Sequence, residues 1–230
     1  MPDPGKVILI ASPLGNLGDL SIRATEALQQ CDFCIAEDTR VSAKLLQHVG
    51  VKKPLAVLNE HTQAGKIQQY LDRVAAGETA VVLSDGGTPC ISDPGAIFVD
   101  LARERDIEVD AIPGPSAVTQ ALMLSGFFAQ RFVFLGFLGR KPGDIRRDLE
   151  AYVDSTLTIV LFESPYRVEA LCRVAAEALP GRRVAICREL TKLHQQVVVT
   201  TLEEFPTESV MPRLGEFTVV IEGKRRQPRN

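Results

Sequence analysis

The first half of the chain alternates short apolar runs with segments of helical periodicity, and this alternation is what most constrains its fold. Five apolar runs predict strands, at Val7–Ala11, Phe33–Ala36, Leu55–Leu58, Ala80–Leu83 and Val109–Ile112. Four segments between them have helical spacing, at Leu20–Gln30, Val41–Val49, Ala64–Ala76 and Ala96–Arg105. Such alternation is typical of a mostly parallel sheet with helices on both faces. The entirely apolar run at Val7–Ala11 predicts a central strand.

The pattern changes after Pro113–Ser116, and we expect a domain junction near this point. The predicted helix at Ala117–Leu124 is followed by two further helices, at 146–153 and 168–179. Strands are predicted at 132–135, 156–162, 184–187, 197–201 and 216–221. Because late strands follow one another without a helix between them, the second domain should have a mixed sheet with some antiparallel pairing. The predicted organisation is an N-terminal α/β domain at 1–118, a connecting helix or linker at 119–130, a C-terminal mixed α/β domain at 131–223 and a disordered tail at 224–230.

Composition narrows the class of protein. With 45% hydrophobic and 24% charged residues, the 230-residue chain has the composition of a globular domain or two. No apolar stretch approaches the ~20 residues that a membrane span needs, and the first residues lack the layout of a secretory signal. We therefore expect a cytoplasmic protein that does not contact a membrane. A net charge of −3 argues against coating nucleic acid by bulk electrostatics.

The cysteines do not suggest a disulfide framework, since there are five and they are scattered. Cys31 and Cys34 have the spacing of a redox or zinc half-site, but no second pair follows and the three histidines do not cluster. This pair closes a predicted helix instead of opening one, unlike a thioredoxin-type motif. We therefore predict two half-buried structural thiols and no metal.

Four loops that follow predicted strands carry the residues best suited to binding or catalysis. These loops are Ser12–Asp19, Glu37–Arg40, Ser84–Gly95 and Pro113–Ser116. In a parallel sheet they would all lie on one edge, where open α/β sheets bind ligands. A related stretch, Phe162–Arg167, ends a strand of the second domain, so a cleft between the domains is the expected site. The known phosphate-binding spacings are absent. Because prolines remove N–H donors, the loops favour a neutral or partly cationic ligand held by carbonyl groups and packing.

These motifs, taken in order, resemble those of the ribosomal RNA small subunit methyltransferase I family, within the tetrapyrrole-methylase-like superfamily. The resemblance covers about Lys6 to Gly223, and its motifs are Ala11–Leu17, Ala36–Arg40, Ser84–Gly95, Ile112–Ala117, Phe162–Pro165 and Arg188–His194. Thr88 stands where relatives that act on tetrapyrroles carry the Asp of Gly-Asp-Pro, which fits the RNA branch. The segment Asn59–Gln63 departs from the family's usual His-Glu-His-Asn-like stretch.

The resemblance implies two α/β domains of the tetrapyrrole methylase type with S-adenosylmethionine in the cleft between them. It implies methylation of a ribose 2′-hydroxyl on a cytidine of 16S rRNA, near the decoding centre of the small ribosomal subunit, by a homodimer. Matching positions place the cofactor contacts at Pro13, Leu14, Asp85, Gly86, Gly87, Thr88, Ile91, Ser116, Ala117 and Phe162.

Methyl transfer from a sulfonium is an in-line displacement, and a base near the ribose hydroxyl would assist it. The candidate bases at strand ends are Glu37, Asp38, His61, Glu163 and Lys192. We favour Glu37 or Asp38, with Arg40 orienting the substrate. Alternatively, Asp38 caps the helix that begins near Val41, Glu37 pairs with Arg40, and Lys192 contacts an RNA phosphate as a cation.

The basic stretch Gly139–Arg147 interleaves with Phe134 and Phe137, the combination expected of an RNA-binding surface. The alternative is a solvated loop and helix start. The candidate RNA contacts are Arg23, Lys44, Arg140, Lys141, Arg146 and Arg147. Two rival functions remain open, a tetrapyrrole C-methyltransferase and a non-catalytic module that binds S-adenosylmethionine or RNA.

Overall fold

The computed structural model describes residues 5–225, and the chain divides into two compact units, Met1–Ser116 and Ala117–Asn230. Each unit contains one five-stranded sheet. Within the described residues, no helix is long and apolar enough to cross a membrane.

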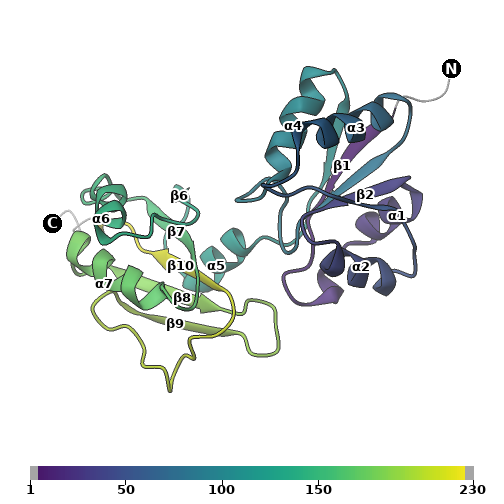
Figure 1. Cartoon of the computed structure of the whole chain (residues 1–230). Coiled ribbons are helices and arrows are strands. Elements are labelled where there is room, and N and C mark those ends of the chain that lie inside the picture. The colour runs from purple at the N-terminus through teal and green to yellow at the C-terminus, as the bar shows by residue number, and fades with distance from the viewer. Residues whose placement is uncertain (1–4, 226–230) are drawn as a thin grey trace. The chain divides into compact units, whose positions relative to one another are not determined.

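The first unit is built on a sheet in which all neighbouring strands are parallel, in the order β3-β2-β4-β1-β5 (Figure 1). Its strands are β1 (Lys6–Ile10), β2 (Phe33–Ala36), β3 (Leu55–Val57), β4 (Ala80–Leu83) and β5 (Glu108–Ile112). Its helices are η1 (Leu17–Asp19), α1 (Ile22–Gln30), α2 (Thr39–His48), α3 (Ala64–Ala75) and α4 (Gly95–Glu104). The predicted elements of this half are confirmed to within a few residues. β1 is an interior strand, as its apolar sequence requires, although β4 occupies the middle of the sheet.

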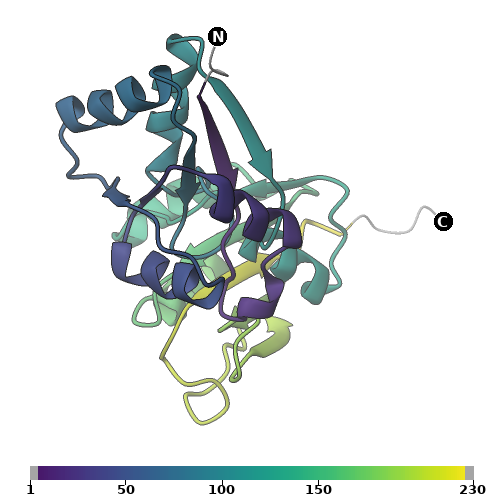
Figure 2. The same cartoon turned by 90° about the vertical axis from the view of Figure 1, so that its right-hand side faces the viewer.

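Side-chain alternation along the strands gives this sheet two separate cores. Val7 and Val82 face the buried side chains of α3 and α4, which include Leu71 and Phe98. Residues one position on, such as Ile8, face α1 and α2 instead. The two helix pairs therefore lie on opposite faces of the sheet (Figure 2). Because both faces are covered, the strands can be apolar throughout.

The second unit has the mixed sheet predicted for it, in the order β6-β7-β10-β8-β9. Its strands are β6 (Phe132–Phe134), β7 (Thr158–Glu163), β8 (Arg183–Arg188), β9 (Gln196–Thr201) and β10 (Phe217–Ile221). Its helices are α5 (Ala117–Ser125), α6 (Pro142–Glu150) and α7 (Val168–Ala178). Only β6 and β7 pair in parallel, and the other neighbours are antiparallel.

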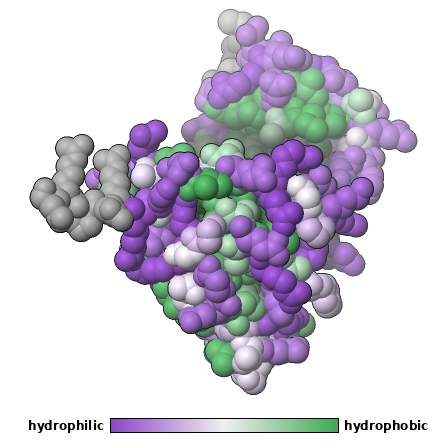
Figure 3. Space-filling view, turned by 90° about the vertical axis from the view of Figure 1, so that its left-hand side faces the viewer, coloured by the Kyte–Doolittle hydropathy of each residue, from purple (hydrophilic) through white to green (hydrophobic). Residues whose placement is uncertain are grey.

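The core of this unit lies between its sheet and the apolar sides of α6 and α7, where Leu149 and Leu171 meet Ile159 and Ile186. Hydrophilic side chains predominate on the face of the unit seen in Figure 3, as expected for helices whose apolar sides turn inward.

Three expectations differ from the structure. Helix α6 begins at Pro142, four residues before the predicted start, because proline lacks the N–H group that the first helical position leaves unpaired. Helix α5, which extends into the segment predicted as a connecting helix or linker, packs on strands of the second unit. In the tail predicted to be disordered, Lys224 and Arg225 are placed and form ion pairs with Asp154 and Glu222. Residues 226–230 of that tail lie outside the described residues.

Candidate active site at the carboxyl edge of the parallel sheet

The four predicted loops lie on the same edge of the first sheet, and hydrogen bonds tie them together. Ser12 and Gly87 exchange two backbone hydrogen bonds, with N–O distances of 2.8 and 2.9 Å. The Thr88 hydroxyl donates to the carbonyl oxygen of Pro115 at 3.1 Å. The backbone N–H of Asp38 donates to Oδ1 of Asp85 at 3.0 Å. The loop after β4 therefore contacts each of the other three, which makes it the centre of the site.

This central loop holds an unusual backbone conformation. Gly87 has a φ of 86°, and the non-glycine residues Cys90 and Ser92 have φ values of 69° and 56°. Asp93 supports these positions, since its Oδ1 accepts from the N–H of Gly95 at 2.7 Å and of Cys90 at 3.3 Å. Left-handed conformations at non-glycine residues cost free energy and occur often in ligand-binding loops.

The rim of this edge combines apolar side chains with an unpaired buried hydroxyl. Leu14 is half-buried and Ile91 is 44% exposed, so apolar surface is available for a ring. A Cβ added at Gly86 would lie 3.8 Å from the carbonyl oxygen of Pro13, which is van der Waals distance, so the two loops are neighbours there. The Ser12 hydroxyl is buried and has no partner among the described residues. A hydroxyl in that state is available to a ligand.

Carboxylates gather at this edge and make it electronegative. Burial raises the pKa of Glu37, and the charges of Asp85, Asp93, Glu60 and Asp38 raise it further. Burial likewise raises the pKa of Asp85, although its hydrogen bond from Asp38 opposes the shift. A field of unpaired negative charge favours a cationic ligand such as a sulfonium or an ammonium.

Asp38 and Arg40 form a pair of their own, which excludes the alternative in which Glu37 pairs with Arg40. The Arg40 Nη2 lies 2.6 Å from the Asp38 Oδ2, and the Arg40 side chain is 87% exposed. The Arg40 guanidinium lowers the pKa of Asp38 to about 2. Asp38 also caps α2, as the other alternative holds, by accepting from the Arg40 N–H at 2.8 Å. Asp38 is thus a weak base, and Glu37 is left as the more basic carboxylate.

We expect substitutions of these two carboxylates to change stability in opposite directions. Because the folded state raises the pKa of Glu37, its charge costs stability at a pH of about 7, and Glu37→Gln should raise Tm. That gain should vanish as the pH falls below the ordinary glutamate value. The folded state lowers the pKa of Asp38, so Asp38→Asn should lower Tm, and this loss should fade as the pH falls toward 2. Asparagine keeps the helix cap, so the comparison isolates charge. Thermal unfolding across this pH range would test both signs, and equal shifts in the two variants would contradict the assignment.

The remaining predicted site residues lie at the end of the first unit and in the second unit. Phe162, near the end of β7, packs against the rings of Phe134 and Phe137 at centroid distances of 4.8 and 5.7 Å. The neighbouring Glu163 is buried and lies 3.0 Å from the Arg167 Nη2. Ala117 is the first residue of α5, and Ser116 is the last residue of the first unit.

Lys192 is held by two carboxylates, with its Nζ 2.8 Å from the Glu189 Oε1 and 3.0 Å from the Glu216 Oε2. Burial opposes the charge on Lys192, but these hydrogen bonds outweigh it and raise its pKa. Lys192 therefore stays protonated, and its geometry favours a role as a cation over a role as a base. The side chain of His61, another candidate base, is exposed. His61 lies in a turn where its backbone N–H donates to the Asn59 Oδ1 at 3.0 Å.

The structure separates the predicted RNA contacts into different environments. Arg146 pairs with Glu177, and Arg147 lies 3.0 Å from the Asp144 Oδ1, so two of these cations are already neutralised. Arg140 and Lys141 are exposed at the start of α6. In the first unit, Lys44 is exposed on α2. Arg23 lines a cavity with Lys6 and Thr79, which start or precede strands, and therefore lies at the opposite edge from the candidate site.

The Cys31 and Cys34 thiols are fully buried, not half-buried as predicted, with their sulfur atoms 3.8 Å apart. Cys31 is the C-terminal cap of α1, and the chain enters β2 directly after it. Across residues 5–225, no group of three or more His, Cys, Asp or Glu side chains could hold a metal ion.

Comparison with known proteins first defines the class. Residues 6–206 match the family model described as Tetrapyrrole (Corrin/Porphyrin) Methylases. The crystal structure of the methyltransferase CobJ has the same fold, with a TM-score of 0.72, 17% identity and 97% coverage of both chains. The two-unit architecture described above is therefore that of a tetrapyrrole methylase.

Curated relatives then narrow the class. The Ribosomal RNA small subunit methyltransferase I of Thermotoga maritima is 41% identical over 96% of this chain and 99% of its own length. The protein of that name from Synechocystis is also 41% identical, over 95% of this chain and 79% of its own length. This chain thus belongs to the ribosomal RNA small subunit methyltransferase I family, within the tetrapyrrole methylases.

Proposed function

We propose that the protein transfers a methyl group from S-adenosylmethionine to the ribose 2′-hydroxyl of a cytidine in 16S rRNA of the small ribosomal subunit. One structural observation carries this proposal. Hydrogen bonds from the loop after β4 join the family's first four motifs into one electronegative edge of the sheet. The family membership, at 37–41% identity to the curated relatives, supplies the substrate class.

The residues present fit the donor. We assign its contacts to Pro13, Leu14, Asp85, Gly86, Gly87, Thr88 and Ile91 in the first unit, together with Ser116, Ala117 and Phe162. The apolar rim, the buried Ser12 hydroxyl and the unpaired carboxylates match an adenine ring, a ribose and a sulfonium charge, respectively. A solved neighbour of the same fold supports this assignment. It is a uroporphyrin-III C-methyl transferase from Thermus thermophilus complexed with S-adenyl homocysteine, with a TM-score of 0.66 and 18% identity over 96% of this chain and 98% of its own. When bound, the donor supplies an electrophilic methyl group.

The chain's own groups would prepare the acceptor. Glu37 is the best-placed base in the first unit, because its raised pKa gives it a stronger affinity for a proton than an ordinary carboxylate has. The Asp38–Arg40 pair presents an exposed guanidinium beside it, suited to orient a ribose or phosphate oxygen. Lys192 is held protonated by its two carboxylate partners and would not act as the base.

We also propose that the protein acts in the cytoplasm, where ribosomal subunits are assembled, and that it works as a homodimer. Sedimentation of the purified chain would test the dimer directly. A species with the mass of one chain at working concentration would remove the dimer from the proposal.

The reaction is tested by incubating the purified chain with labelled S-adenosylmethionine and one of three acceptors. These are small subunits from cells that lack this activity, free 16S rRNA, and a porphyrin precursor. We expect label in a cytidine ribose of the subunit RNA, located by mass spectrometry of nuclease fragments. Label in the porphyrin alone would support the rival tetrapyrrole reaction. Cofactor binding in calorimetry without turnover on any acceptor would support the non-catalytic module.

A further inference from the structure

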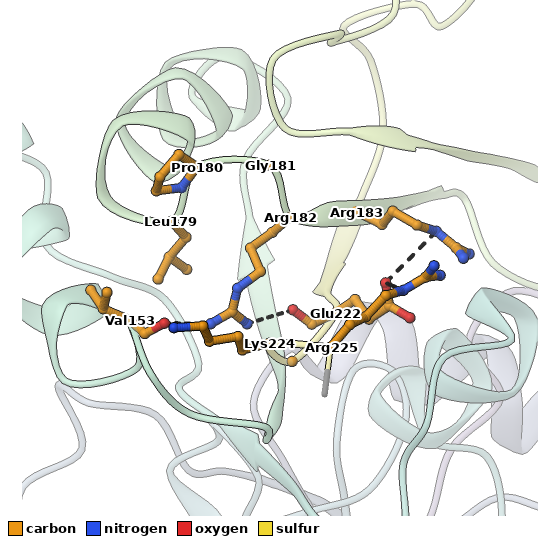
Figure 4. Close-up of a pocket in the computed structure, with 10 residues that line it drawn as sticks. Val153, Leu179, Pro180, Gly181, Arg182, Arg183, Glu222, Lys224 and Arg225 are labelled. Atoms are coloured by element: carbon orange, nitrogen blue, oxygen red, sulfur yellow. Dashed lines mark hydrogen bonds and ion pairs between the residues drawn. The ribbon is translucent and has the colours of Figure 1, made fainter. Parts of the chain in front are cut away.

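A cavity in the second unit gathers cations that lie far apart in the sequence. It has a volume of about 320 Å³ and lies where β8 begins and β10 ends (Figure 4). Four cations and one carboxylate are among its lining residues, namely Arg182, Arg183, Lys224, Arg225 and Glu222. In a chain with a net charge of −3, this is a marked local excess of positive charge.

Arg182 forms the floor of this cavity. It is 7% exposed, and its guanidinium donates to the carbonyl oxygens of Glu222, Tyr152, Val153 and Ser155 at 2.7 to 3.2 Å. Figure 4 shows its side chain reaching from the start of β8 toward the backbone of Glu222. Arg182 therefore fixes the backbone that carries the other cations.

The two neighbouring arginines keep most of their donors unused. Arg183 and Arg225 each direct Nε toward the Glu222 Oε2, at 3.8 and 3.0 Å. Within the described residues, their terminal nitrogens have no protein acceptor. The Arg183 guanidinium also lies over the Phe127 ring at 4.7 Å, which fixes its plane. An arginine whose Nε is paired and whose two terminal nitrogens are unpaired is suited to bind two oxygens of a phosphate.

The charge of the surroundings supports an anionic ligand. Lys224 is 56% exposed and contacts Asp154, and Glu203 accepts from the Gly181 N–H, so two carboxylates lie just outside the lining. With Glu222 included, the four cations face three carboxylates, so an excess of positive charge remains. Two cations of the basic stretch that the sequence singled out are paired as well, with Glu177 and Asp144.

We propose that this basic cavity binds backbone phosphates of the substrate rRNA, outside the region of the reacting ribose. The inference rests on the proposed function, since it requires an RNA substrate. The cavity and Phe162 lie at opposite ends of β7, a strand of six residues that spans roughly 17 Å at ~3.3 Å per residue. A contact at that distance binds ground state and transition state equally, so it contributes to KM and not to kcat.

The test removes two cavity cations in the full chain. The variant Lys224→Gln/Arg225→Gln is compared with Arg103→Gln/Arg173→Gln, which removes two exposed cations from α4 and α7. Affinity for undermodified small subunits is measured across a salt series, along with kcat and KM. Each lost phosphate contact should lower the slope of log affinity against log salt by roughly 0.7–0.9. We expect a decrease of about 1.5 in the cavity variant, several-fold higher KM, kcat within about twofold of wild type, and no such change in the control.

Several outcomes would overturn the proposal while leaving the proposed function intact. With active wild-type enzyme, an unchanged slope and KM in the cavity variant would show that the cavity does not contact RNA. An equal loss in the control variant would assign the effect to bulk charge. Arg183→Gln provides an independent second variant, and thermal unfolding checks that each protein is folded. Lys224→Arg, which keeps the charge, should retain the wild-type slope. Wild-type enzyme without any transfer to rRNA would instead reject the proposed function.

Discussion

Glu37→Gln should lower kcat for methyl transfer by roughly 10²–10⁴-fold, the range expected on loss of a general base. The substitution keeps the shape of the side chain and removes its affinity for a proton. Burial and neighbouring carboxylates raise the pKa of Glu37, which makes it a stronger base than an ordinary carboxylate. Asp38 is tied to Arg40, with a pKa lowered to about 2, and is too weak a base.

The measurement is a steady-state assay on undermodified small subunits, with binding of S-adenosylhomocysteine followed by calorimetry. The affinity for the demethylated product should not weaken more than about twofold, because the substitution affects a proton transfer and not the adenosyl contacts. In wild type, kcat should fall as the pH drops through the raised pKa of Glu37, and this limb should be absent from the variant. Glu104→Gln, on the exposed surface of α4, controls for loss of one carboxylate. Wild-type turnover in Glu37→Gln would remove Glu37 from the mechanism.

Arg182→Met should destabilise the second unit by about 3–5 kcal/mol. Its guanidinium serves four carbonyl groups from two segments of the chain, and each lost hydrogen bond costs ~1 kcal/mol. Methionine fills much of the same volume but donates no hydrogen bond. The loss should fall on the loop at Tyr152–Ser155 and on the end of β10, which Arg182 holds together.

Urea unfolding, combined with hydrogen exchange to assign the transition to its unit, would measure this effect, because two units need not unfold in one step. The matched control is Arg183→Met, one residue along β8. The Arg183 side chain is 39% exposed and makes only a long ion pair and a ring contact, so the expected cost is within about 1 kcal/mol. Equal destabilisation by both variants would show that the four carbonyl contacts contribute little.

Sequence periodicity was sufficient for most of the fold. The apolar runs at Phe33–Ala36 and Ala80–Leu83 are strands with the predicted bounds. All side chains of these strands are buried, so the apolar run and the strand begin and end at the same residues. Helix α6 begins at Pro142, a residue favoured at the first position of a helix. The helix predicted at Arg146–Val153 starts four residues too far along the chain, because that prediction followed the apolar side chains and ignored the proline. The strand-end motifs also predict that four loops meet, since parallel strands bring their carboxyl ends to one edge, and the structure brings these loops together there.

The sequence alone did not predict which charged side chains pair with one another. Adjacent residues suggested that Glu37 could pair with Arg40, but Arg40 contacts Asp38. Of the four carboxylates that raise the pKa of Glu37, Asp85, Asp93 and Glu60 come from loops after other strands. The basic stretch at Gly139–Arg147 is partly neutralised by Glu177, thirty residues away in the chain, whose approach depends on the packing of α6 against α7.

The sequence by itself determined the order of strands and helices, the family and the loops that carry the chemistry, because these depend on local periodicity and on motifs that are contiguous in the chain. Tertiary structure alone decided which charges are paired and which stay open. It brings Arg182 and Arg183 beside Lys224 and Arg225 through the antiparallel pairing of β8 with β10. Electrostatic interactions depend on distance in space, and a linear sequence does not contain those distances.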